Sequence, residues 1–119
     1  MKEKINLRIG LKNKNIFLEA RKCNYLDEAF GLMFQKKTKA RALLFDFTGR
    51  KGLVLHSLFV FFPFLAIWLD DKNRILELKI VKPFTFNVYS KKQFSKIVEI
   101  PINKKYSKII KKLVGKRKI

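Results

Sequence analysis

The sequence predicts a mainly β fold: a single compact, barrel-like domain with antiparallel or mixed strand pairing and two short helices. Three observations predict it. Apolar and polar residues alternate with a period of two in several short segments, as they do in strands. Turn-forming Gly, Pro, Asn and Asp separate these segments. Helical patterns are confined to two stretches, at about 25–31 and 103–113.

Length and composition bound the class of protein. A chain of 119 residues suits one domain, with 114–119 as a flexible basic tail or a final short strand. A hydrophobic content of 48% is typical of a globular protein. The single cysteine, Cys23, excludes an internal disulfide framework and a cysteine-rich metal site. Residues 1–10 alternate like a strand and contain no apolar run of the signal-peptide type, so we expect a cytoplasmic protein.

The first two strands are predicted at 4–9 and 16–22, joined as a hairpin by the turn LKNKN at 11–15. In the second strand three small or aliphatic side chains point to one face and two charged side chains point to the other. These are Ile16, Leu18 and Ala20, and Glu19 and Arg21.

A short helix is predicted next, at about 25–31. Asn24 is placed to cap its start, Asp27 and Glu28 lie in its first turn, and Gly31 ends it. Adjacent residues of a helix do not face each other, so the two acidic residues favour the helix dipole rather than forming a catalytic pair. A third strand follows at 42–47, ALLFDF.

The stretch from Gly52 to Leu69 has no formally charged side chain and is nearly long enough to cross a bilayer. Pro63 argues against a helix there, because proline lacks an N–H donor and clashes with the preceding turn. The flanking segments read as amphipathic strands, which need a core on which to pack. The stretch therefore predicts two strands, at 53–62 and 64–69, that are covered on both faces.

The C-terminal half predicts a turn at 70–74, a strand that ends before Pro83, and a strand at 94–100 that Pro101 closes. The first of these strands shows clean alternation. Its inward residues are Leu76, Leu78 and Ile80, and its outward residues are Glu77 and Lys79.

The last helix has a predicted cap at each end, Asn103 and Gly115. Its apolar residues recur at helical spacing and form a narrow stripe. They are Tyr106, Ile109, Ile110 and Leu113.

Several motifs together resemble the small family catalogued as domain of unknown function 192. They are DEAFGLMF (27–34), ALLFDF (42–47), LHSLFVFFPFLAIWLDDKNRILEL (55–78), VKPF (81–84), IVEIP (97–101) and KKLVGKRKI (111–119). The resemblance covers about residues 20–119 and implies a mainly β, barrel-like domain. Glu28 stands where many members have an arginine, and Pro63-Phe64-Leu65 where many read Pro-Leu-Asp. The family has no established activity, so the resemblance implies a fold and not a function.

The charge is the outlying feature of the composition. Twenty-eight Lys and Arg stand against nine Asp and Glu, a net charge of +19 that attracts polyanions. From Lys91 to Ile119 there are eleven basic residues against Glu99 alone. We therefore expect a binding module for RNA or DNA backbone, although composition alone could also produce this charge. The predicted contacts are Lys104, Lys105, Lys108, Lys111, Lys112, Lys116 and Arg117. The aromatic residues that could stack on bases are Phe84, Phe86, Tyr89 and Phe94, most of which the core needs.

Two other hypotheses remain open. His56 is the only imidazole, and Asp46 on the preceding strand could orient it as a general base in an enzyme or a small-ligand site. Alternatively, the last helix could lie on an anionic membrane surface through Ile109 and Leu113. With one His and one Cys, the chain predicts no metal site and no cofactor. Its five glycines are scattered singly, so no phosphate-binding glycine loop is expected.

Overall fold

The computed structural model describes residues 3–23, 40–46, 62–83 and 93–115. The predicted helix at 25–31 and residues 53–61 of the predicted strand at 53–62 lie outside these residues. Of the predicted tail or final strand at 114–119, residues 116–119 lie outside as well, whereas Val114 belongs to the last helix. The described chain contains six strands, a 3₁₀ turn and one helix. In chain order they are β1 (Glu3–Leu11), β2 (Lys14–Cys23), β3 (Leu43–Asp46), β4 (Phe64–Leu69), β5 (Ile75–Val81), β6 (Lys96–Pro101), η1 (Lys104–Tyr106) and α2 (Ser107–Val114).

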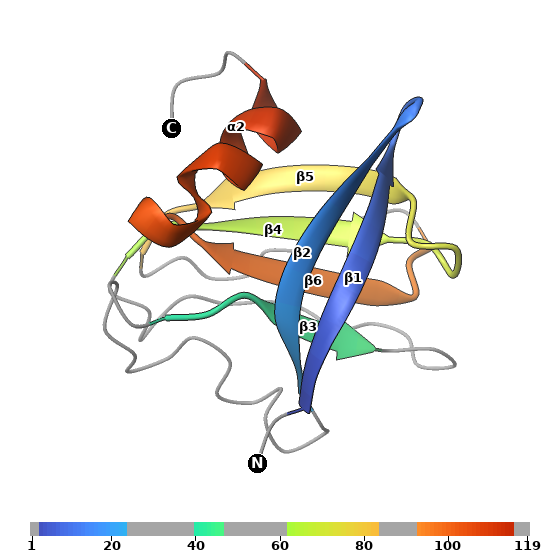
Figure 1. Ribbon diagram of the computed structural model, residues 1–119, viewed down its shortest axis with the longest axis horizontal. Coiled ribbons are helices and arrows are strands. Elements are labelled where there is room, and N and C mark those ends of the chain that lie inside the picture. The colour runs from blue at the N-terminus through green and yellow to red at the C-terminus, as the bar shows by residue number, and fades with distance from the viewer. Residues whose placement is uncertain (1–2, 24–39, 47–61, 84–92, 116–119) are drawn as a thin grey trace.

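The six strands form one curled sheet in the order β1-β2-β3-β6-β4-β5. Every pairing is antiparallel except that of β2 with β3, which is parallel from Arg21 to Cys23. The β1–β2 hairpin crosses in front of β6, β4 and β5, so the sheet folds back over itself (Figure 1). The Gly10 N–H donates to the Asn73 carbonyl at 2.9 Å and joins the hairpin to the start of β5. This arrangement confirms the predicted mainly β, barrel-like fold with mixed pairing.

The hairpin is longer and its turn is tighter than the sequence predicts. Leu11 pairs directly with Lys14, which leaves a two-residue turn at Lys12 and Asn13 in place of the five-residue turn expected. Lys12 adopts a left-handed backbone, with φ of 54°. Such a residue reverses the chain within two positions, so the alternating pattern continues almost to the tip.

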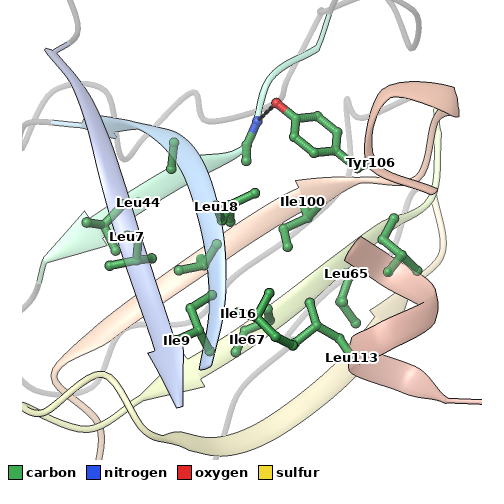
Figure 2. Packing of buried hydrophobic residues seen from close by; sticks show 14 of the residues in the cluster. Leu7, Ile9, Ile16, Leu18, Leu44, Leu65, Ile67, Ile100, Tyr106 and Leu113 are labelled. Carbon is green, nitrogen blue, oxygen red and sulfur yellow. Dashed lines mark hydrogen bonds between the residues drawn. The ribbon is translucent and has the colours of Figure 1, made fainter. Parts of the chain in front are cut away.

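The sheet has a core on each face. The first core cluster lies between the β1–β2 hairpin, α2 and the facing strands (Figure 2). Its buried members include Leu7, Ile9, Ile16, Leu18, Leu44, Leu65, Ile67, Ile100, Tyr106, Ile110 and Leu113. The second core cluster covers the opposite face of β3, β6 and β4. It contains Ala40, Leu43, Phe45, Phe62, Phe64, Ala66, Trp68, Val81 and Ile97.

Strand β4 lies between these clusters, and all six of its residues are buried. This confirms the prediction of a strand at 64–69 that is covered on both faces, and it explains why that segment carries no alternation. No helix in the described part of the chain is long and apolar enough to cross a membrane.

Strand β5 departs from its predicted pattern. Leu78 packs against the first core cluster as expected, but Ile80 is exposed. Glu77 and Lys79, predicted to point into solvent, are half-buried, and the Lys79 Nζ lies 5.5 Å from the centre of the Trp68 ring. The reason is that, among the described strands, β5 pairs only with β4, and that β4 has a core on both sides. A strand at such an edge is only partly covered on either face.

The end of the chain follows the prediction with one correction. Gly115 caps α2 with φ of 66°, and its N–H donates to the Lys111 carbonyl at 2.9 Å. Asn103 occupies the cap position of η1, but its side chain makes no capping bond. Its Nδ2 donates instead to the Ala40 carbonyl at 3.3 Å, so this side chain joins η1 to the segment before β3.

Candidate functional site

The predicted basic face is present on η1 and α2. Its five described lysines are all exposed: Lys104, Lys105, Lys108, Lys111 and Lys112. We call these five residues the lysine face; Lys116 and Arg117, predicted to belong to it, lie outside the described residues. Within the described chain, none of the five forms an ion pair with an acidic side chain. The ion pairs there join Lys4 to Glu19, Arg74 to Asp70 and Lys79 to Glu77.

The lysine face opposes the stability of its own helix. Lys108 lies four residues from both Lys104 and Lys112, a spacing at which like charges destabilise a helix by about 0.2–0.5 kcal/mol per pair. Lys104 and Lys105 stand at the N-terminal end, where the helix dipole favours anions, and the first turn has no acidic residue. Lys111 and Lys112 in the last turn suit the dipole. A bound anion would offset both the repulsion between the lysines and their unfavourable interaction with the N-terminal end of the helix dipole.

The opposite side of α2 is fixed in the core. Ile110, Leu113 and Val114 are buried in the first core cluster, and Ile109 is half-buried against it. This orients the lysines outward. The membrane-surface hypothesis requires Leu113 to contact lipid, but the core already covers this side chain, because Leu113 is only 5% exposed.

Two hydrogen bonds hold the start of this helical segment against the sheet. The Tyr106 hydroxyl accepts the Ala42 N–H at 2.8 Å, a buried bond drawn in Figure 2. The second is the bond from Asn103 to Ala40. Burial raises the pKa of Tyr106 above its ordinary value, although the Ala42 N–H and the charge of Arg41 oppose the shift. The phenol is therefore neutral at ordinary pH and serves as a structural acceptor.

A groove of about 460 Å³ separates α2 from the tip of the β1–β2 hairpin. Its hairpin side includes Leu11, Lys14, Ile16 and Phe17, and its helix side includes Ile109 and Lys112. We call it the hairpin–helix groove. It lies beside the lysine face, with which it shares Lys112.

Phe17 is the residue of this groove that the sequence analysis missed. Phe17 is 69% exposed, whereas its neighbours Ile16 and Leu18 are buried. The signal was present in the alternation, which puts residue 17 on the outer face with Glu19. Phe94, which the sequence analysis named, is half-buried against the second core cluster.

The proposed pair of His56 and Asp46 is not tested by the structure, because His56 lies outside the described residues. Asp46 is half-buried at the end of β3, opposite Lys96 on β6. Among the described residues, no group of three His, Cys, Asp or Glu side chains lies close enough to hold a metal ion.

The burial of one acidic residue was not predicted from the sequence. Glu99 is only 5% exposed and lies on β6 between Leu43 of β3 and Ala66 of β4. Alternation with Ile97 places it on the face of the second core cluster.

The fold has relatives among solved structures. A protein of unknown function from Novosphingobium aromaticivorans superposes with a TM-score of 0.72 at 12% sequence identity, covering 89% of this chain and 78% of that chain. A candidate transcription regulator from Sinorhizobium meliloti superposes with a TM-score of 0.71 at 14% identity, covering 92% and 86%. At these identities the likeness shows the fold alone. No protein-family model and no curated protein matches the sequence.

Proposed function

We propose that this domain binds the phosphate backbone of nucleic acid through the lysine face of η1 and α2. The observation that carries the proposal is the set of five exposed lysines, none of which has an acidic partner among the described residues. The net charge of +19 adds a long-range attraction for polyanions.

The mechanism is electrostatic. Each lysine that neutralises a phosphate releases condensed counterions, so affinity falls steeply as salt rises. Lysine presents a point charge on a flexible stem and carries no sequence information in such a contact. The lysine face therefore supplies affinity and leaves base sequence unread.

The structural neighbours are consistent with this proposal but add no residue-level support. One of the two is a candidate transcription regulator, and only its fold is comparable at 14% identity. The resemblance to domain of unknown function 192 and the site at His56 and Asp46 stay predictions.

The test is a titration of the full chain into labelled single-stranded RNA and duplex DNA at several salt concentrations. For the wild type, the logarithm of the affinity should fall with the logarithm of the salt concentration with a slope of several units. The reason is that each phosphate contact contributes about one unit to that slope. Lys108→Glu, at the centre of the lysine face, should reduce both the affinity and the slope.

The matched control is Lys72→Glu, which makes the same change in net charge. Lys72 is exposed in the β4–β5 turn, away from α2 (Figure 1). It should lower affinity far less than Lys108→Glu. If the two variants lose affinity equally, binding follows net charge alone and the proposed lysine face is wrong. Absence of salt-dependent binding by the wild type would refute the proposal altogether.

A further inference from the structure

We infer that the hairpin–helix groove receives an unstacked nucleobase, so that the preferred ligand of this domain is a single-stranded nucleic acid. The inference rests on the proposed function, because the lysine face would hold the backbone from which the base projects. It adds a second kind of contact, to the flat surface of a base, which the lysines cannot supply.

The exposure of Phe17 supports a stacking contact. Only two large hydrophobic residues of the described chain are exposed, Phe17 at 69% and Ile80 at 37%. Across the hairpin, Phe17 is paired with the exposed Arg8. An exposed aromatic ring amid positive charge is the combination on which single-strand binding proteins stack bases.

The hairpin–helix groove combines apolar surface with positive charge. Ile16 and Ile109 give it apolar surface, and Lys14 and Lys112 place a positive charge on the hairpin side and on the helix side. Its volume of about 460 Å³ is in the range of small-molecule sites. A base would contact the apolar surface while the phosphates before and after it meet the lysines.

Among the described strands, the edge of β2 that faces away from β1 is paired only at its end. The Arg21 N–H points away from β1 and donates to the Ala42 carbonyl at 2.9 Å. By the period of two in a strand, the main-chain groups of Asn15 and Phe17 point the same way. In the described part of the chain β2 meets β3 only from Arg21 onward, so no strand pairs with these groups. They offer N–H donors and C=O acceptors to the polar edge of a base.

An acidic peptide that adds to β2 as an extra strand would use the same edge and the same lysines. The base is favoured because a peptide rich in Asp and Glu makes no use of the Phe17 ring or of Ile109. The two occupants differ in their dependence on Phe17, and this difference decides the test.

The experiment measures the affinity of the full chain for four labelled probes at one moderate salt concentration. Three are nucleic acids of about ten nucleotides, within the site size of single-strand binding folds: single-stranded RNA, duplex DNA, and an abasic sugar-phosphate strand of equal length. The fourth probe is poly-glutamate. The variants are Phe17→Thr, which keeps the propensity for a strand, and the matched control Ile80→Thr, which changes the other exposed large hydrophobic residue of the described chain.

We expect the wild type to prefer the single strand over the duplex and the abasic strand. Phe17→Thr should weaken single-strand binding about five-fold or more, the loss typical of one stacked base. It should leave the duplex, abasic and poly-glutamate affinities within two-fold, and Ile80→Thr should leave all four unchanged.

Three results would overturn the inference. The first is an unchanged single-strand affinity in Phe17→Thr, and the second is an equal loss for the abasic strand. The third is a poly-glutamate affinity that falls with Phe17→Thr, which would assign the groove to an acidic peptide. If Lys108→Glu weakens nucleic-acid binding while Phe17→Thr does not, the proposed function stands and only the base site is wrong. If neither variant matters, both fail.

Discussion

The Tyr106 hydroxyl accepts the Ala42 N–H at 2.8 Å across 64 residues of sequence. The bond links the start of the last helical segment to the residue before β3. Both residues are buried in the first core cluster, so water cannot replace the bond. The orientation of the lysine face depends on this contact as well as on apolar packing.

Removing the hydroxyl with Tyr106→Phe should destabilise the domain. The change keeps the ring in the core but leaves a buried main-chain N–H without an acceptor, at a cost of about 1–3 kcal/mol. Chemical denaturation measures the free energy of unfolding. Ser107→Ala is the control, because it deletes an exposed hydroxyl that bonds to the Lys104 carbonyl at 3.2 Å. Equal losses of unfolding free energy in the two variants would show that the buried hydrogen bond of Tyr106 contributes no more than the exposed one of Ser107.

The same tyrosine should make the free energy of unfolding decrease at alkaline pH. Burial raises its pKa in the folded state above the ordinary value of about 10. Below pH 10 the phenol is neutral in both the folded and the unfolded chain, so Tyr106 makes its full contribution to the free energy of unfolding. Above pH 10 the unfolded chain releases the phenol proton before the folded chain does, so stability falls until the folded pKa is passed.

The comparison of wild type with Tyr106→Phe isolates this effect, because the two proteins differ only in the phenol hydroxyl. The difference in their free energies of unfolding should shrink as pH rises above 10. A difference that stays constant or grows would contradict the raised pKa.

Lys12→Gly should stabilise the hairpin. Lys12 has φ of 54°, a conformation that costs a residue with a Cβ about 1 kcal/mol and costs glycine little. Asn13→Gly is the control, since Asn13 has no positive φ and glycine there only adds freedom to the unfolded chain. Denaturation midpoints should move upward for the first variant and downward for the second. If both midpoints move in the same direction, the left-handed backbone of Lys12 is not the cause of the change in stability.

Lys108→Glu should raise stability while it lowers affinity for nucleic acid. The new carboxylate lies in the first turn of α2, where the dipole favours it, and faces Lys112 at the i+4 position. Together these terms contribute about 0.5–1 kcal/mol. Thermal unfolding without ligand measures the gain, against Lys72→Glu as the control for reduced net charge. If Lys108→Glu is no more stable than Lys72→Glu, repulsion among the lysines of the lysine face does not lower the stability of the domain, and a bound anion has no repulsion to offset.

The sequence by itself determined the elements whose pattern is local. Alternation identified the β1–β2 hairpin, and turn-forming residues identified the acidic turn before β5. A continuous apolar run after Pro63 identified the strand at 64–69, and the spacing from Tyr106 to Leu113 identified the last helix. Such patterns report which side of one segment is apolar, and nearest neighbours along the chain suffice to read them. The exposed lysines follow directly, since a helix that buries one side presents the other.

Only the tertiary structure decided how these elements meet. The parallel pairing of β2 with β3, the second core cluster and the exposure of Ile80 depend on which strands become neighbours. The hairpin–helix groove joins Phe17 to Ile109, two residues that no local pattern connects. A side chain that its own strand marks as outward becomes part of a candidate site only because the sheet curls and brings α2 beside it. Periodicity describes one segment at a time, whereas a groove is a property of two.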